Sequence, residues 1–143
     1  MTPEDIACVQ STWMKLIPTA EEVATLFYGR LFECNPELRP LFKGDMEEQG
    51  RRIMGMIHSA IIRLDDLEPL LPALRASGAR HAGYGVGPAD YDKMAEALYW
   101  TLEQTLAEDF TPEVRSAWAA VYDEVAAIML AGSRRPEGSR GLG

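Results

Sequence analysis

The stretch GARHAGYGVG, residues 78–87, places a histidine in the last turn of a helical pattern, just before the chain breaks into glycines. Leu70, Leu74 and His81 recur at helical spacing, so they share one face of a helix predicted over about 69–82. His81 therefore points toward the core, and the small residues around it leave room for a bound group. A core histidine bonded to a backbone carbonyl fits this position too, so the rest of the sequence has to decide.

The remaining sequence has the same helical periodicity, and no strand-like alternation or internal repeat interrupts it. Thr2 and Asp45 are predicted helix N-caps, and Thr19 with Glu22 is predicted to form a capping box. The sequence predicts an all-α fold with helices over about 3–17, 20–35, 36–42, 46–64, 69–82, 88–106 and 112–131. We expect one domain over 1–132, followed by a polar, glycine-rich tail over 133–143 that is disordered.

Composition excludes several classes of function. The 143 residues carry a net charge of -8, which repels nucleic acid and anionic membranes. No apolar run is long enough to cross a bilayer, and the first ten residues, MTPEDIACVQ, lack the pattern of a signal peptide. Cys8 and Cys34 are interpreted as buried thiols in a reducing cytoplasm, and one disulfide between them stays open as an alternative. We therefore expect a cytoplasmic protein.

Two further polar side chains share apolar helix faces. Gln49 lies in line with Ile53, and Tyr28 lies in line with Leu31. Each can be an ordinary hydrogen-bonded core residue, but together with His81 they indicate a pocket that holds a ligand. One histidine without cysteines or nearby carboxylates makes a poor zinc site. One imidazole from the protein is enough for haem iron, because the porphyrin nitrogens supply the other four ligands.

The second histidine of the sequence, His58, follows Gln49 by nine positions. That spacing puts it on the opposite face of the same helix. His58 is therefore predicted to be solvated.

Three segments carry a resemblance to a known family: LFYGRLFECNPELRPLF (26–42), GARHAGYGV (78–86) and FTPEVRSAWAAVYDEVAAIM (110–129). Together they resemble the globins, specifically single-domain bacterial haemoglobins, and are similar to vertebrate neuroglobins, over about residues 4–130. The resemblance implies a globin fold, with about seven helices packed three over three around a haem pocket.

The resemblance also implies roles for particular residues. His81 would be the proximal ligand of the iron in haem b, and its other ring nitrogen would donate to the carbonyl of Ser77 or Leu74. Three other residues complete the implied pocket: Phe42 against the porphyrin, Ile53 at the ligand boundary and Tyr91 beside the histidine.

On the distal side, Tyr28 and Gln49 would donate hydrogen bonds to bound dioxygen and so take the catalytic positions. Arg52 and Arg80 can reach haem propionates from the rim, or can remain solvated surface charges. The glutamate that supports the histidine in related bacterial haemoglobins would fall near Ser133, where the sequence has no carboxylate.

The function implied is reversible binding of dioxygen, nitric oxide and carbon monoxide, with nitric oxide dioxygenase activity. The sequence has no GxGxxG following a strand, so electrons would come from a separate reductase. Two alternatives stay open: a dioxygen carrier, store or gas sensor without turnover, and a haem-free regulatory module with a globin fold. We expect a monomer or weak dimer.

Overall fold

A computed structural model describes the backbone of residues 1–42, 44–83 and 85–140, with side chains through residue 132 except at 43 and 84. Within these ranges the chain is helical, as the sequence predicts, and it contains no strand. The α-helices are α1 (Pro3–Leu16), α2 (Ala20–Cys34), α3 (Met46–Ile62), α4 (Leu71–Gly83), α5 (Pro88–Leu106) and α6 (Pro112–Arg140). Short 3-10 helices cover Ile17–Thr19, Pro36–Leu41, Glu68–Leu70 and Ala107–Asp109.

Two of the predicted helices differ from those observed. The segment predicted as a third helix is the 3-10 turn Pro36–Leu41, which contains Pro40 and so lacks a backbone donor that an α-helix would use. Helix α6 continues to Arg140, so the backbone is helical over most of the predicted tail. Residues 141–143 lie outside the described residues, and so does the side chain of Ser133.

The helix caps explain where the first helices begin. Thr2 accepts from the Asp5 amide and Asp45 from the Glu47 amide, so both predicted N-caps are confirmed. The capping box predicted for Thr19 is wrong, because its hydroxyl donates instead to the Leu16 carbonyl, at 3.4 Å. Thr19 is the last residue of a 3-10 turn that directly continues α1, so its side chain faces backward along the chain.

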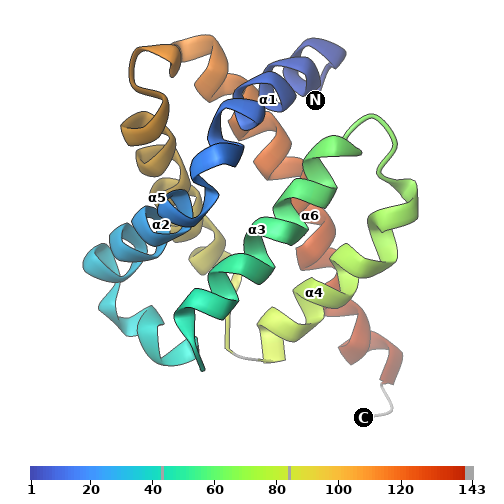
Figure 1. The fold of residues 1–143 in the computed structure, drawn as a ribbon. Helices are drawn as coiled ribbons and strands as arrows, with labels where there is room; N and C mark the ends of the chain where they lie inside the picture. Colours follow the sequence, from blue (N-terminus) through green and yellow to red (C-terminus); the bar gives the residue numbers. More distant parts are fainter. Residues whose placement is uncertain (43, 84, 141–143) are drawn as a thin grey trace.

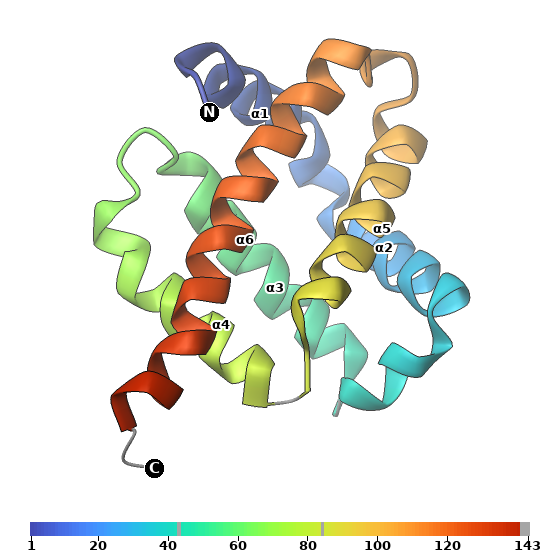
Figure 2. The ribbon, with the colours of Figure 1, turned by 180° about the vertical axis from the view of Figure 1, so that it is seen from behind.

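The helices cross in two layers around a central core. Helix α3 crosses the molecule in front of α6 in Figure 1, and α6 runs along the rear, as Figure 2 shows from behind. Helix α4 packs on α6, and α2 packs on α5. A core cluster that includes Val9, Trp13, Leu102 and Trp118 ties α1, α5 and α6 together.

The contact between α4 and α6 is unusually close. A Cβ atom built on Gly78 would lie 2.7 Å from Met129 Cα, and one on Gly132 would lie 2.6 Å from Arg75 Cα. Only glycine permits such an approach, since real Cβ atoms do not come this near to another backbone. The close approach holds α4 against α6, and it also fixes the position of the residues on α4 one turn after Gly78.

Cys8 is half-buried and Cys34 is exposed, and both are free thiols. The expectation of a buried thiol is therefore wrong for Cys34, which lies on the last turn of α2. Burial, together with the nearby Asp5 and Glu113 carboxylates, raises the pKa of the Cys8 thiol. No helix in the described part of the chain is both long and apolar enough to span a membrane.

Candidate functional site

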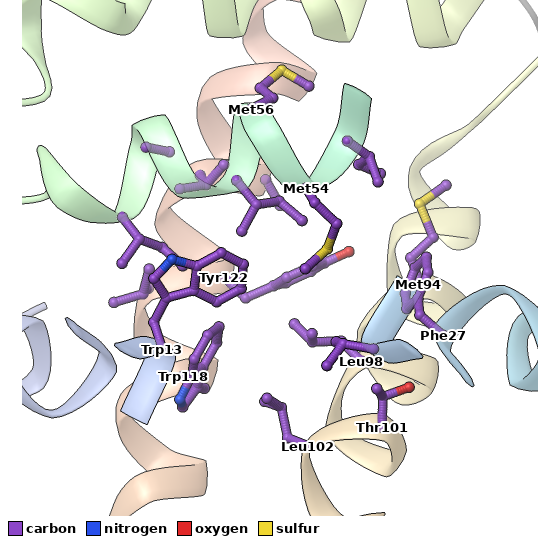
Figure 3. Close-up of a pocket in the computed structure, with 18 of the residues that line it drawn as sticks. Trp13, Phe27, Met54, Met56, Met94, Leu98, Thr101, Leu102, Trp118 and Tyr122 are labelled. Atoms are coloured by element: carbon purple, nitrogen blue, oxygen red, sulfur yellow. The ribbon is translucent and has the colours of Figure 1, made fainter. Parts of the chain in front are cut away.

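An apolar cavity of about 200 Å³ lies at the centre of the helices. Side chains from all six α-helices line it, and Figure 3 labels ten of these residues, among them Trp13, Met54 and Tyr122. Its polar groups are few, and they include His81, Tyr91 and Thr101. An apolar cavity with a few placed polar groups is the usual form of a small-molecule or cofactor site.

His81 is the basic group of this cavity. Its ring comes from α4, two residues before that helix ends at Gly83. The Nδ1 atom lies 2.6 Å from the Ser77 carbonyl oxygen, and a carbonyl can only accept. Nδ1 therefore carries the proton and donates, which confirms Ser77 as the predicted partner. The tautomer leaves the lone pair of Nε2 available for a ligand.

The donor set fits haem better than a bare metal ion. No group of three or more histidine, cysteine, aspartate or glutamate side chains gathers into a metal site among the described residues. A structural zinc ion needs such a group, whereas haem iron needs one imidazole from the protein. The cavity offers one imidazole, oriented by a carbonyl, in apolar surroundings.

Two tyrosines that line the same cavity as His81 connect α5 and α6. The Tyr122 hydroxyl donates to the Tyr91 carbonyl, at 2.6 Å, and Figure 3 shows the Tyr122 ring reaching into the cavity. The Tyr91 hydroxyl is buried and has no hydrogen-bond partner in the described part of the chain. Burial raises the pKa of both phenols, so both stay neutral donors. An unpaired buried donor of this kind is costly unless a ligand satisfies it.

The sequence reasoning did not single out Tyr122. Tyr122 lies four residues after Trp118, so the helical periodicity of α6 places both residues on the same inward face. This spacing could have identified Tyr122 as a residue of the core.

The structure separates the predicted distal residues from His81. Ile53 lines the same cavity as His81 and Tyr91, whereas Tyr28, Gln49 and Phe42 do not. Gln49 is half-buried, and its Nε2 atom lies 3.8 Å from where a Cβ on Gly44 would stand.

Tyr28 belongs to a second core cluster, which also contains Phe32 and Phe42. Its ring stacks on Phe32 and meets Phe42 edge-on, with ring centres 5.8 and 5.6 Å apart. Burial raises the pKa of Tyr28 to about 12, so the hydroxyl is a neutral donor at physiological pH.

The two arginines lie on the outer surface. Arg52 is exposed and pairs with Glu48, one turn earlier on α3, at 3.3 Å. Arg80 is also exposed, next to His81 in sequence, and neither arginine lines the cavity. Their role toward a cofactor stays a prediction.

His58 is not solvated, so that prediction is wrong. The Trp13 indole donates to His58 Nδ1, at 3.0 Å, and the ring centres lie 6.2 Å apart. The histidine is half-buried because α1 packs across the flank of α3. Periodicity within one helix identifies the face toward the main core, but it does not show that a second helix covers another face.

A family model described as globin matches residues 25–129 of the chain. Neuroglobin of the fish Tetraodon nigroviridis is 27% identical over 146 residues, covering 92% of both chains. A flavohemoprotein of Bordetella parapertussis is 28% identical over 137 residues, covering 94% of this chain but only 34% of that protein.

A solved structure has the same fold. It is an engineered carbene transferase, described provisionally as a nitric oxide dioxygenase from Rhodothermus marinus. The TM-score is 0.89 over 97% of both chains, at 22% sequence identity. At this identity the likeness shows the arrangement of the helices and no more.

Proposed function

The chain belongs to the globin family, and from this premise we propose that it holds haem b through His81 and reversibly binds dioxygen, nitric oxide and carbon monoxide. One observation carries the proposal: Nδ1 of His81 donates to the Ser77 carbonyl, at 2.6 Å, and the ring lines the central cavity. The free Nε2 of a neutral imidazole is the usual ligand of haem iron.

When bound, haem supplies an iron centre that takes up a diatomic gas. The chain's own contribution is to hold that centre in a dry, apolar surrounding, which limits water and ions. Ile53 and Met54 from α3 line the cavity together with His81 and Leu74 from α4, so we propose that the cofactor lies between these two helices.

Tyr28 lies one turn after Ala24 on α2, and Gln49 lies one turn before Ile53 on α3; Ala24 and Ile53 line the cavity. We propose that, once haem is bound, Tyr28 and Gln49 reach in from the edge of the cavity and act as hydrogen-bond donors to bound dioxygen. The raised pKa of Tyr28, at about 12, supports this role because it keeps the hydroxyl protonated. A hydrogen bond to a partly charged oxygen is worth roughly 1.5–3 kcal/mol, so such a donor slows dioxygen release. Slow release suits storage or nitric oxide dioxygenation better than bulk transport.

We further propose nitric oxide dioxygenase activity, with nitric oxide and dioxygen giving nitrate in the cytoplasm. The likeness to a flavohemoprotein supports it, although the chain spans only 34% of that protein's length. A separate reductase would supply the electrons. The alternatives are a dioxygen store or sensor without turnover and a haem-free regulatory module.

The test has two stages. Haem titrated into the purified chain should give a Soret band that saturates at one equivalent, and adding dioxygen or carbon monoxide to the reduced protein should shift that band. Nitrate should then form from nitric oxide and dioxygen over many turnovers when a flavin reductase is added. No saturable Soret band would refute the haem proposal, and gas binding with a single turnover would refute the enzyme.

A further inference from the structure

Two hollows in the molecule share a wall. An outer pocket of about 580 Å³ lies between α2, the 3-10 turn Pro36–Leu41 and α3. Tyr28 and Phe32 line it, and neither of them lines the central cavity. Ala24 and Met54 line both hollows. The wall between the outer pocket and the central cavity is therefore one side chain thick at these two residues.

The two parts of this wall differ in how they can move. Helices α2 and α3 come close at Gly50, where an added Cβ would lie 3.4 Å from Ala24 Cβ and 3.9 Å from Tyr28 Cε2. Such a contact consists of backbone and a methyl group, which cannot rotate aside. Met54 lies one turn further along α3 and has an unbranched side chain with three rotatable bonds. Figure 3 shows its sulfur pointing into the cavity, and the residue is half-buried.

We propose that Met54 is a gate through which small neutral gases pass from the outer pocket to the cavity of His81. When the thioether rotates toward either hollow, it opens a path beside the fixed contact of Ala24 with Gly50. A change of rotamer is fast compared with movement of a helix. The identity of the gases rests on the proposed function, whereas the path itself rests on the two hollows and their shared wall.

The apolar lining of the central cavity selects for neutral molecules. Glu21, Arg39, Glu47 and Arg51 line the outer pocket, whereas the central cavity is almost wholly apolar. A hydrated ion that moves inward past Met54 would lose its water without gaining a charged partner. Neutral diatomic gases do not have this desolvation cost. The gate should therefore admit dioxygen and carbon monoxide and exclude iodide.

The first test uses the haem-loaded protein and carbon monoxide after flash photolysis. Met54→Phe adds a stiff ring to the gate, and this ring must leave its preferred rotamer to let a gas pass. We therefore expect the bimolecular recombination rate to fall about fivefold, which corresponds to the cost of one off-rotamer side chain. Met54→Ala should raise that rate about twofold or more. Met56 is the matched control, since it lies on the same helix and lines the cavity but not the outer pocket. Met56→Phe and Met56→Ala should leave the rate nearly unchanged.

The second test needs no haem. Trp13 and Trp118 line the central cavity, and Trp100 lies elsewhere, beneath Arg30. In the full-length Trp100→Phe chain, quenching of indole fluorescence by dissolved dioxygen measures entry into the cavity. Adding Met54→Phe should lower the quenching constant, adding Met54→Ala should raise it, and iodide should quench weakly in all three. Circular dichroism checks that each variant keeps its helices.

The two tests separate this inference from the proposed function. Equal dioxygen quenching in the Met54 variants and the parent would overturn the gate, and so would equal effects of the Met54 and Met56 substitutions on recombination. A chain that takes up no haem would refute the proposed function while the quenching test still decides the gate.

Discussion

Gly78→Ala should loosen the contact between α4 and α6 and lower the stability of the fold. The added Cβ would overlap the backbone carbonyl of Met129 and lie 2.7 Å from its Cα atom. These are main-chain atoms of α6, so no rotamer change relieves the clash and the helices must separate. Because Gly78 lies one turn before His81, the same movement displaces the histidine.

Two opposing effects set the size of the change. Overpacking of a close contact costs roughly 1–3 kcal/mol, and a clash with backbone belongs at the upper end. Alanine in place of glycine within a helix returns about 1 kcal/mol through its better propensity. We therefore expect a net loss of about 2 kcal/mol in the free energy of unfolding. For a protein of this size, this loss corresponds to a decrease of about 1 M in the urea midpoint.

Gly55 provides the matched control for this substitution. It lies inside α3, and a Cβ built there meets nothing within 4 Å. Gly55→Ala should therefore stabilise the protein by about 0.5–1 kcal/mol. Urea unfolding followed by circular dichroism compares the two variants with the parent. If Gly78→Ala raised the midpoint as Gly55→Ala does, the close approach of α4 and α6 would be refuted.

Three further predictions concern hydrogen-bonding side chains. Tyr28→Phe should raise the dioxygen off-rate about tenfold, because it removes one hydrogen bond to the partly charged oxygen. Stopped-flow displacement of dioxygen by carbon monoxide measures this rate. An unchanged rate would show that Tyr28 does not contact the bound gas. Burial raises the pKa of Tyr28 from 10.0 to about 12, so the folded state holds this proton more tightly than the unfolded chain. The stability that depends on the protonated Tyr28 hydroxyl is therefore fully present below pH 10 and is lost between about pH 10 and 12. Over that pH range, the urea midpoint of Tyr28→Phe should fall less than the urea midpoint of the parent. His58→Phe removes the acceptor of the Trp13 indole and should cost roughly 1–3 kcal/mol in urea unfolding; equal midpoints would show that the Trp13–His58 bond adds nothing.

The helical fold could be predicted from the sequence because local signals and core burial agree. Thr2 and Asp45 cap helices where predicted, and inward positions such as Leu74 and Trp118 are buried. The errors come from effects that a single helix does not encode. Thr19 turns back toward α1 because a 3-10 turn joins the two helices, and His58 is covered because α1 crosses α3.

The proximal half of the candidate site could be predicted for a similar reason. Helical spacing placed His81 on the core face, and a carbonyl four residues earlier is the partner that helix geometry makes available. The distal half depends on how α2 and α3 are rotated against each other. That rotation places Tyr28 in an outer pocket with Phe32 and leaves Met54 in the wall, which no spacing along one helix reveals.

The central claim is that His81, and not His58, holds haem in this chain. The direct measurement is the Soret band and the haem content of His81→Ala and His58→Ala after desalting, with the parent alongside. His81→Ala should lose its haem, because among the two histidines only His81 lines the cavity. His58→Ala should keep it, since His58 bonds to Trp13. Retained haem in His81→Ala with loss in His58→Ala would contradict the account.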